Sequence, residues 1–337
     1  MKKRVLIFGI TGQIAFYLAE FLLKKDYEVY GVYRRTSLDI GERLNPLIKN
    51  IKLIEGDITD ADSVLRAVKE SNPDEIYNLA AQSHVPSSWS QPISTGDITG
   101  LGVVRILEAI RIVNPKIKFY QSSSSELFGK VQETPQKETT RFYPRSPYAA
   151  AKAYGYYITI NYRESYGIFA CNGILFNTES PKRPKQFVTR KISNSVAKIK
   201  LGKQEYFEIG NIDSKRDWEY AEDAVRAMWL MMQQDKPEDF VISTGKTYSV
   251  REFIEEAFKV VNMNIKWEGE GVNELGKVKG KVVVRINPKF YRPTEVDLLV
   301  GDYSNLHNKT GWKPKTTFPE LVKMMVDNDI AEESNGK

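Results

Sequence analysis

The chain has 337 residues, with 49 lysines and arginines against 43 aspartates and glutamates, one cysteine and two histidines. The single cysteine, Cys171, excludes an internal disulfide and a thiolate metal cluster and favours a reducing compartment, so we expect a cytoplasmic protein. His84 and His307 are too isolated for the usual spacing of zinc ligands, and no metal site is expected. Any catalysis must therefore rest mostly on tyrosine, lysine, serine or carboxylate side chains.

The net charge of +6 is spread over a sequence with nearly as many acidic as basic residues. A dispersed surplus suits a small acidic ligand as well as a nucleic acid, and without a long basic run we expect no nucleic acid partner. The apolar run at residues 5–10 is too short for a signal peptide. No stretch approaches the roughly 18 apolar residues of a membrane span, so no membrane partner is expected either.

Short apolar strands and amphipathic helices alternate in the first third of the chain. We expect strands at Val5–Phe8, Glu28–Tyr33, Ile51–Ile54, Glu75–Leu79 and Ile117–Tyr120. Helical spacing predicts helices at Gln13–Lys25, Ala61–Glu70 and Gly100–Val113. This alternation predicts right-handed crossovers and an α/β fold, a Rossmann-type doubly wound parallel sheet.

Beyond Tyr148 the pattern loosens. A helix at Tyr148–Tyr166 and a strand at Ile168–Phe176 precede a polar, proline-bearing segment, 177–186, that is a plausible crossing into a second lobe. Further helices are expected at Val188–Lys200, Ala221–Gln234, Val250–Val261 and Pro319–Asn328. The strand-like residues 240–243 can return to the first sheet, so the lobes are expected to interleave in sequence.

A glycine turn follows the first strand and opens the first helix: Gly9, Thr11, Gly12, Gln13 and Ile14. Glycines there let backbone amides approach a pyrophosphate, while the helix N-terminus supplies partial positive charge. A tight strand-to-helix turn without a ligand would have the same pattern. Its place at the first crossover favours a dinucleotide site.

Arg34 and Arg35 stand at the end of the second strand, where an acidic residue would bind the ribose hydroxyl of NAD. Arginine binds phosphate oxygens bidentately, so this pair favours the 2′-phosphate of NADP over a solvated basic loop. Asp57, followed by Ile58, can bind the adenine edge, although a turn or a helix cap would also explain it.

Tyr148 and Lys152 are four residues apart on a predicted helix, so the phenol and the ammonium share one face. A nearby cation lowers the pKa of a phenol and lets it act as a base near neutral pH. Such pairs also arise by chance on helix surfaces.

Ser124 and Glu126 follow the strand that ends at Tyr120, at the carboxyl end that faces the ligand crevice of a parallel sheet. A hydroxyl and a carboxylate are thus expected near the nicotinamide. Ser122 and Ser125 are more simply explained as caps of the following turn.

With the segment Asn78-Leu79-Ala80-Ala81, these motifs resemble an extended short-chain dehydrogenase/reductase of the nucleotide-sugar branch. The C-terminal half resembles the GDP-mannose 4,6-dehydratase family through residues 177–181 (NTESP), 187–191 (FVTRK), 210–211 (GN), 215–218 (KRDW), 292–297 (RPTEVD) and 311–314 (GWKP). The likeness extends from Val5 to about Ile330. It departs from the usual pattern at Ile14, at Ser124, where threonine is common, and at Thr178, where histidine is usual.

The resemblance implies conversion of GDP-mannose to GDP-4-keto-6-deoxymannose and water, with NADP recycled internally. It implies a catalytic set of Ser124, Glu126, Tyr148 and Lys152, and it adds Leu79, Ala80, Tyr148 and Lys152 to the cofactor contacts. The implied substrate-binding residues are Ser83, Asn177, Val188, Lys191, Gly210, Arg216, Arg292 and Glu295. Arg216 precedes Asp217, and an ion pair between them would also explain it.

The same likeness implies a domain division and an assembly. Residues 1–177, with a return segment near 212–245, are expected to form the NADP-binding domain, and 178–211 with 246–337 a smaller mixed α/β lobe for the sugar nucleotide. A homodimer or a homotetramer is implied. Three alternatives stay open: a GDP-linked heptose as substrate, an NADP-dependent 4-reductase or epimerase using only Tyr148 and Lys152, and a non-catalytic NADP-binding regulator.

Overall fold

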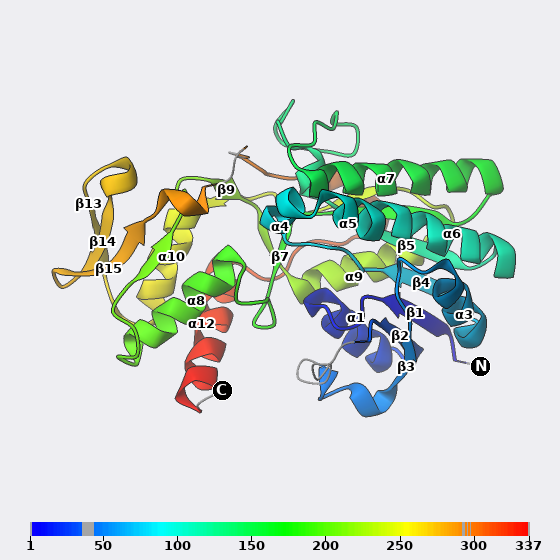
Figure 1. Ribbon diagram of the computed structural model, residues 1–337, viewed down its shortest axis with the longest axis horizontal. Helices are drawn as coiled ribbons and strands as arrows, with labels where there is room; N and C mark the ends of the chain where they lie inside the picture. Colours follow the sequence, from blue (N-terminus) through cyan, green and yellow to red (C-terminus); the bar gives the residue numbers. More distant parts are fainter. Residues whose placement is uncertain (1, 36–43, 292–293, 295, 297, 336–337) are drawn as a thin grey trace.

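The computed structural model describes residues 2–35, 44–291, 294, 296 and 298–335, and the chain folds into two lobes (Figure 1). The larger lobe is built on a seven-stranded parallel sheet with the strand order β11-β6-β5-β4-β1-β2-β3. Its strands are β1 (Arg4–Phe8), β2 (Glu28–Tyr33), β3 (Ile51–Glu55), β4 (Glu75–Asn78), β5 (Lys118–Ser124), β6 (Ala170–Leu175) and β11 (Phe240–Ile242). The order reverses between β1 and β4, where open α/β sheets bind ligands at the carboxyl ends of their strands. The predicted Rossmann-type sheet is therefore confirmed.

Helices cover both faces of this sheet because its buried strands are apolar on both sides. Val5 and Ile7 of β1 pack on one face, and Leu6 and Phe8 pack on the other. The first face carries α1 (Gln13–Lys24), α9 (Ala221–Met232) and α11 (Ser304–Thr310), and the second carries α3 (Ala61–Ser71), α6 (Gly102–Val113) and α7 (Pro147–Tyr166).

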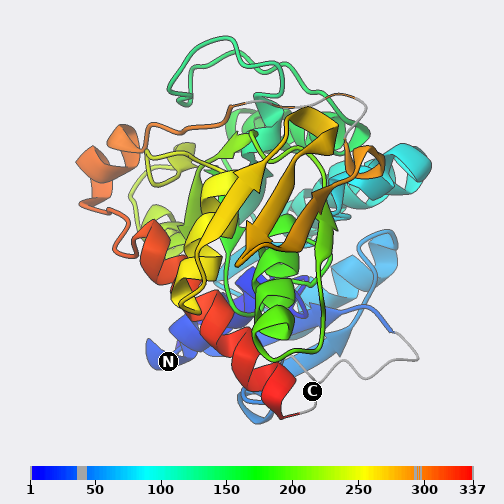
Figure 2. The same cartoon turned by 90° about the vertical axis from the view of Figure 1, so that its left-hand side faces the viewer.

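The second lobe has its own apolar core. Its helices are α8 (Val188–Lys200), α10 (Val250–Val260) and α12 (Phe318–Ser334), and its sheet has the order β13-β14-β15-β8, with β8 (Phe207–Ile209), β13 (Ile265–Glu268), β14 (Leu275–Val278) and β15 (Lys281–Ile286). The strands from β13 to β15 pair antiparallel, and β15 pairs parallel with β8. Figure 2 shows this lobe from its own side, with α12 running beside α8.

Short elements connect the two lobes. The pairs are β7 (Asn177–Glu179) with β10 (Trp218–Tyr220), and β9 (Lys215–Arg216) with β12 (Tyr248–Ser249). The remaining helical turns are η1 (Ile48–Asn50), α4 (Val85–Ser90), α5 (Pro92–Gly96), η2 (Asp97–Leu101), η3 (Ser125–Leu127), η4 (Gly271–Asn273) and η5 (Pro288–Phe290). Within the described residues, no helix is both long and apolar enough to cross a membrane.

We propose the domain division expected from sequence with one change. Residues 240–242 do pair with β6, so the chain returns to the first sheet after its first excursion into the second lobe. Leu306 and Trp312, however, pack in the core of the larger lobe, and the indole of Trp312 donates to the Asp223 carbonyl oxygen at 3.0 Å. The segment around α11 therefore fits the NADP-binding domain better than the smaller lobe.

Candidate active site

A cavity of about 950 Å³ lies between the two lobes and reaches from the glycine turn to the second lobe. Predicted residues from both lobes line it: Gly12, Gln13, Ile14, Leu79, Ser83, Ser124, Glu126, Tyr148, Lys152, Asn177, Val188, Lys191, Gly210 and Arg216. Arg292 and Glu295 lie outside the described residues. The structure thus brings most of the predicted catalytic and substrate residues to one place.

The glycine turn is shaped by close backbone approaches. Gly9 has φ +79°, and a Cβ there would lie 2.8 Å from the backbone nitrogen of Ala80, so only glycine fits where the turn crosses Leu79 and Ala80. Gly12 caps α1, and no side chain of the described residues caps that N-terminus. The first amides of α1 and its dipole are therefore available to an anion at the cavity wall.

Gln13 has a structural task in this turn. Its amide donates to the Thr178 carbonyl oxygen at 2.7 Å and accepts from the Ser180 hydroxyl at 2.7 Å. Both ends of the side chain are therefore engaged in joining α1 to the segment that crosses into the second lobe. A ligand contact by Gln13 would come from its backbone.

Arg34 and Arg35 are exposed directly after β2, on the edge where a cofactor ribose is expected. The Asp57 carboxylate accepts from the backbone amide of Thr59 at 2.9 Å and from its hydroxyl at 2.7 Å. Burial would raise the pKa of Asp57, but these two hydrogen bonds and the charge of Arg34 lower it. Ile58 is buried. Asp57 thus stabilises a turn, which was the alternative explanation for this residue. Its carboxylate also stays negatively charged near Arg34.

The catalytic residues are positioned by β5 and α7. Ser124 ends β5, and its hydroxyl accepts from the backbone amide of Glu126 at 3.3 Å, which caps η3. Ser146 caps α7 by accepting from the Ala149 amide at 3.0 Å, so α7 begins just before Tyr148. Burial raises the pKa of Tyr148 to about 12, against a lowering by its hydrogen bond with Ser124. The hydroxyl, the carboxylate and the phenol therefore act on one another at the cavity floor.

Lys152 is buried one helical turn after Tyr148. Its ammonium donates to the Ser122 carbonyl oxygen at 2.6 Å and lies 5.8 Å from the centre of the Tyr148 ring. Burial lowers the pKa of Lys152 to about 8. The two side chains do share one face, as predicted. The expected lowering of the Tyr148 pKa is wrong for this structure, because desolvation outweighs the effect of a cation at this distance.

In the second lobe, Lys191 and Gly210 meet the same aromatic residue. The Lys191 ammonium lies 3.8 Å from the centre of the Phe290 ring, and burial lowers its pKa. A Cβ on Gly210 would lie 2.7 Å from the Phe290 carbonyl oxygen, so glycine lets this segment approach. Asn177 and Val188 line the cavity beside them.

Arg216 is 6% exposed, and its guanidinium donates to the Lys215 carbonyl oxygen at 2.9 Å. The Asp217 carboxylate accepts from the amide and hydroxyl of Thr244 at 2.9 and 2.7 Å and from the Gly245 amide at 2.9 Å. Because these bonds hold the loop after β11, Asp217 has a structural role of its own.

Sequence reasoning missed several cavity residues from the loop before α8. Arg183 packs its guanidinium 3.8 Å from the centre of the Phe187 ring and lies 3.2 Å from the Glu179 carboxylate. His84 contacts the same ring at 5.8 Å between centroids, and Trp89 also lines the cavity. The basic run at residues 182–185 was the available signal, and only the fold shows which of its side chains face inward.

Comparison with known proteins identifies the family of this chain. The sequence profile described as GDP-mannose 4,6 dehydratase matches residues 6–325. This chain belongs to the GDP-mannose 4,6-dehydratase family. The GDP-mannose 4,6 dehydratase of Cricetulus griseus is 54% identical over 98% of this chain and 92% of its own, and the GDP-mannose 4,6-dehydratase of Vibrio cholerae is 50% identical over 98% and 94%.

Solved structures share the fold of this GDP-mannose 4,6-dehydratase family member. UDP-glucose 4-epimerase from Thermotoga maritima superimposes with a TM-score of 0.82 at 23% identity, over 98% of this chain and 99% of that one. dTDP-glucose 4,6-dehydratase from Bacillus anthracis gives a TM-score of 0.79 at 20% identity, over 99% and 97%. The resemblance read from the sequence is therefore confirmed for the family and for the fold.

Proposed function

We propose that this protein is an NADP-dependent GDP-mannose 4,6-dehydratase, which converts GDP-mannose to GDP-4-keto-6-deoxymannose and water. The observation that carries the proposal is one cavity lined by Ser124, Glu126, Tyr148 and Lys152 on one side and by second-lobe residues with basic and amide side chains on the other. Relatives of that name at 48–55% identity over nearly the full chain support it.

The residues present fit NADP. Gly9 lets the turn cross the backbone of Ala80, and Gly12 has no side chain to cap the first amides of α1, so these amides can face a pyrophosphate. Arg34 and Arg35 would hold a 2′-phosphate. When bound, NADP would supply the acceptor that takes a hydride from sugar C4 and returns it to C6.

The chain's own residues account for the proton transfers. As the phenolate, which the charge of Lys152 would stabilise, Tyr148 would take the proton of the 4-hydroxyl. The resulting 4-ketone makes the C5 hydrogen acidic, and Glu126 would remove it. Ser124 or Glu126 would then protonate the departing 6-hydroxyl, so that one water leaves. As the hydride returns to C6, a proton would return to C5, so that no net oxidation occurs. A simple reductase would need no carboxylate at position 126.

Incubation of the purified protein with GDP-mannose tests this function directly. We expect a sugar nucleotide lighter by one water, with no NADPH consumed or accumulated in proportion to product. Stoichiometric NADPH consumption would instead indicate a 4-reductase. An unchanged sugar nucleotide with intact NADP binding would indicate a regulator. Comparison of kcat/KM for GDP-mannose and a GDP-linked heptose decides the sugar, because Ser83, His84 and Trp89 line the cavity within a segment, residues 82–89, that differs from the common form.

We further propose a cytoplasmic homo-oligomer, a dimer or a tetramer. Exposed aromatic and aliphatic side chains on neighbouring α6 and α7 support it: Ile112, Tyr154, Tyr157 and Tyr166 are 57%, 45%, 58% and 51% exposed. The single cysteine, which is buried, suits a reducing compartment. Light scattering of the purified protein gives the number of copies.

A further inference from the structure

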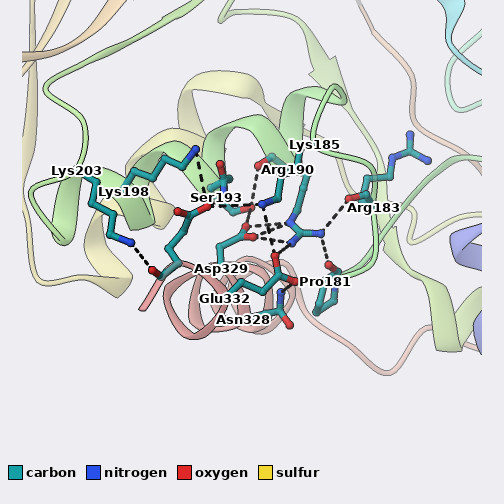
Figure 3. Close-up of polar contacts among 12 residues, drawn as sticks. Pro181, Arg183, Lys185, Arg190, Ser193, Lys198, Lys203, Asn328, Asp329 and Glu332 are labelled. Carbon is teal, nitrogen blue, oxygen red and sulfur yellow. Dashed lines mark hydrogen bonds and ion pairs between the residues drawn. The ribbon is translucent and has the colours of Figure 1, made fainter. Parts of the chain in front are cut away.

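A buried ion pair joins the first helix of the second lobe to the last helix of the chain (Figure 3). Arg190 on α8 and Asp329 on α12 have side-chain exposures of 5% and 0%. The Arg190 Nε donates to the two carboxylate oxygens at 2.8 and 3.0 Å, and Ser193 donates to the same carboxylate at 2.5 Å. A buried pair of this kind gives little net stability compared with apolar residues of equal size. Net stability therefore does not explain a buried ion pair at this place, which points to another role.

The other edge of the same guanidinium binds backbone. Nη1 of Arg190 donates to the carbonyl oxygens of Pro181 and of Arg183, the latter at 3.0 Å. Nη2 donates to the Glu332 carboxylate at 2.8 Å. In Figure 3 the Arg190 side chain lies between α12 and this stretch of backbone, with dashed contacts to both. One buried side chain thus holds two helices and one loop.

The loop in question, residues 180–187 between β7 and α8, forms one wall of the cavity through residues 183–187. Arg183 and Phe187, which pack on each other at 3.8 Å, are both on it. We call it the crossing loop. Its backbone carries cationic side chains to the cavity, so its position decides where those charges meet the phosphates of a nucleotide sugar.

We propose that Arg190 is a positioning residue for substrate binding: it fixes the crossing loop against the C-terminal helix, and Asp329 fixes Arg190. This role rests on the proposed function. Only arginine can do it, because its planar group presents five donors that reach a carboxylate and two carbonyls together, whereas lysine is a point charge. Removal of α12 from its place would therefore disturb the cavity wall from a distance.

Arg190→Lys tests the proposal while keeping a cation beside Asp329. The matched control is Asn194→Ala. Asn194 also joins α8 to α12, donating to Glu333 at 2.9 Å, but within the described residues its side chain makes no hydrogen bond with the crossing loop. We expect Arg190→Lys to raise the KM for GDP-mannose roughly tenfold, which corresponds to about 1.4 kcal/mol of lost binding free energy. We expect kcat to change less than KM, and Asn194→Ala to keep both within about twofold.

A second variant distinguishes a loss of positioning from simple unfolding. Arg190→Met combined with Asp329→Leu replaces the pair with apolar side chains of similar volume, which is often neutral for stability. We expect a melting temperature near that of the wild type together with the raised KM. A raised KM at normal stability supports positioning. A normal KM in this double variant, or an equal rise in Asn194→Ala, overturns it.

Trypsin provides a readout that does not need activity. The crossing loop contains Lys182 and Lys185, and release of its two carbonyls from Arg190 should speed cleavage there in Arg190→Lys but not in Asn194→Ala. If the wild type does not dehydrate GDP-mannose, the proposed function fails, and the cleavage rates still decide whether Arg190 holds the loop. Equal rates in both variants overturn the positioning role.

Discussion

The ammonium of Lys152 lies 5.8 Å from the centre of the Tyr148 ring, and both side chains are buried on the same face of α7. Burial shifts the pKa values of these two side chains in opposite directions. It raises the pKa of the phenol to about 12 and lowers the pKa of the ammonium to about 8. Near neutral pH the structure therefore holds a protonated tyrosine beside a charged lysine. Proton transfer from the sugar to Tyr148 must be made favourable by what binds in the cavity.

Tyr148→Phe removes the proposed base but keeps the ring that packs at the cavity floor. We expect kcat to fall by about a hundred- to ten-thousandfold, the usual contribution of a general base. The melting temperature should change little, because phenylalanine fills the same buried space. Product assayed by mass spectrometry gives the rate. A variant with near-normal turnover would remove Tyr148 from the mechanism.

Lys152→Met should lower the activity and raise the stability of the fold. The folded protein holds the charged ammonium at a cost of about 3 kcal/mol, given a pKa of about 8 against an ordinary 10.5, and methionine fills the site without that cost. Part of the gain is offset by the lost hydrogen bond to Ser122.

The pH dependence gives the sign of the Lys152 effect. Because the folded pKa is depressed, the cost is complete below about pH 8 and disappears as the pH rises towards 10.5. Urea unfolding should show the variant ahead of the wild type at neutral pH and the difference shrinking at higher pH. A difference that grows with pH would contradict the burial of a charged Lys152.

Replacement of Arg34 and Arg35 by alanine tests the choice of cofactor. A hydrogen bond to a charged group contributes about 1.5 to 3 kcal/mol, so we expect NADP affinity to fall roughly 10- to 100-fold or more. Affinity for NAD, which lacks the 2′-phosphate, should stay within a few fold. Titration of both cofactors into the double variant and the wild type measures the ratio. Parallel losses for the two cofactors would show that the arginines do not read the phosphate.

The sequence predicted those parts of the site that depend on local pattern. Tyr148 and Lys152 share a face because helical periodicity fixes that geometry, and Ser124 lies at the cavity because the carboxyl ends of parallel strands meet there. The helix at Val188–Lys200 and the strand at Glu28–Tyr33 have the predicted bounds. Periodicity and strand order were sufficient for these.

What the sequence could not predict depends on residues far apart in the chain. The strands from β13 to β15 were expected only as short strands of a mixed α/β lobe and were not placed, because they are short, half-exposed and stabilised by cross-strand pairing. Arg183 lines the cavity, and its carbonyl oxygen is bound by Arg190, which pairs with Asp329 of the C-terminal helix. The raised pKa of Tyr148 follows from burial, which no spacing between two residues reveals.

Glu219 provides a stability prediction beneath the cavity. It is fully buried on β10, one carboxylate oxygen accepts from the Thr178 hydroxyl at 2.9 Å, and the other has no hydrogen-bond partner among the described residues. Burial raises the pKa of Glu219 well above its ordinary 4.5. The wild type should therefore lose stability as the pH rises above about 4.5, since the unfolded state releases the proton first.

Glu219→Gln removes that titration. We expect the variant to become more stable relative to the wild type as the pH increases from about 4.5 towards neutrality. Urea unfolding of both proteins measures this difference in the free energy of unfolding. Glutamine keeps the acceptor for Thr178, so the local hydrogen bond survives. A constant difference between the two proteins across this range would show that Glu219 does not titrate on unfolding.

Glu126→Gln separates the proposed base at C5 from the rest of the site. Glutamine has nearly the same shape and cannot accept the C5 proton, so we expect water loss from GDP-mannose to fall by about a hundredfold or more. NADP affinity should be retained, because Glu126 lies in η3 and not in the glycine turn. In heavy water the wild type should place deuterium at C5 of the product, and the variant should not exchange it. Glu126→Asp is the matched control: it keeps a carboxylate at a shorter reach and should retain slow exchange. Dehydration by Glu126→Gln at a rate near that of the wild type would assign the proton transfer to Ser124 or to solvent, and the carboxylate would then no longer separate this site from that of a reductase.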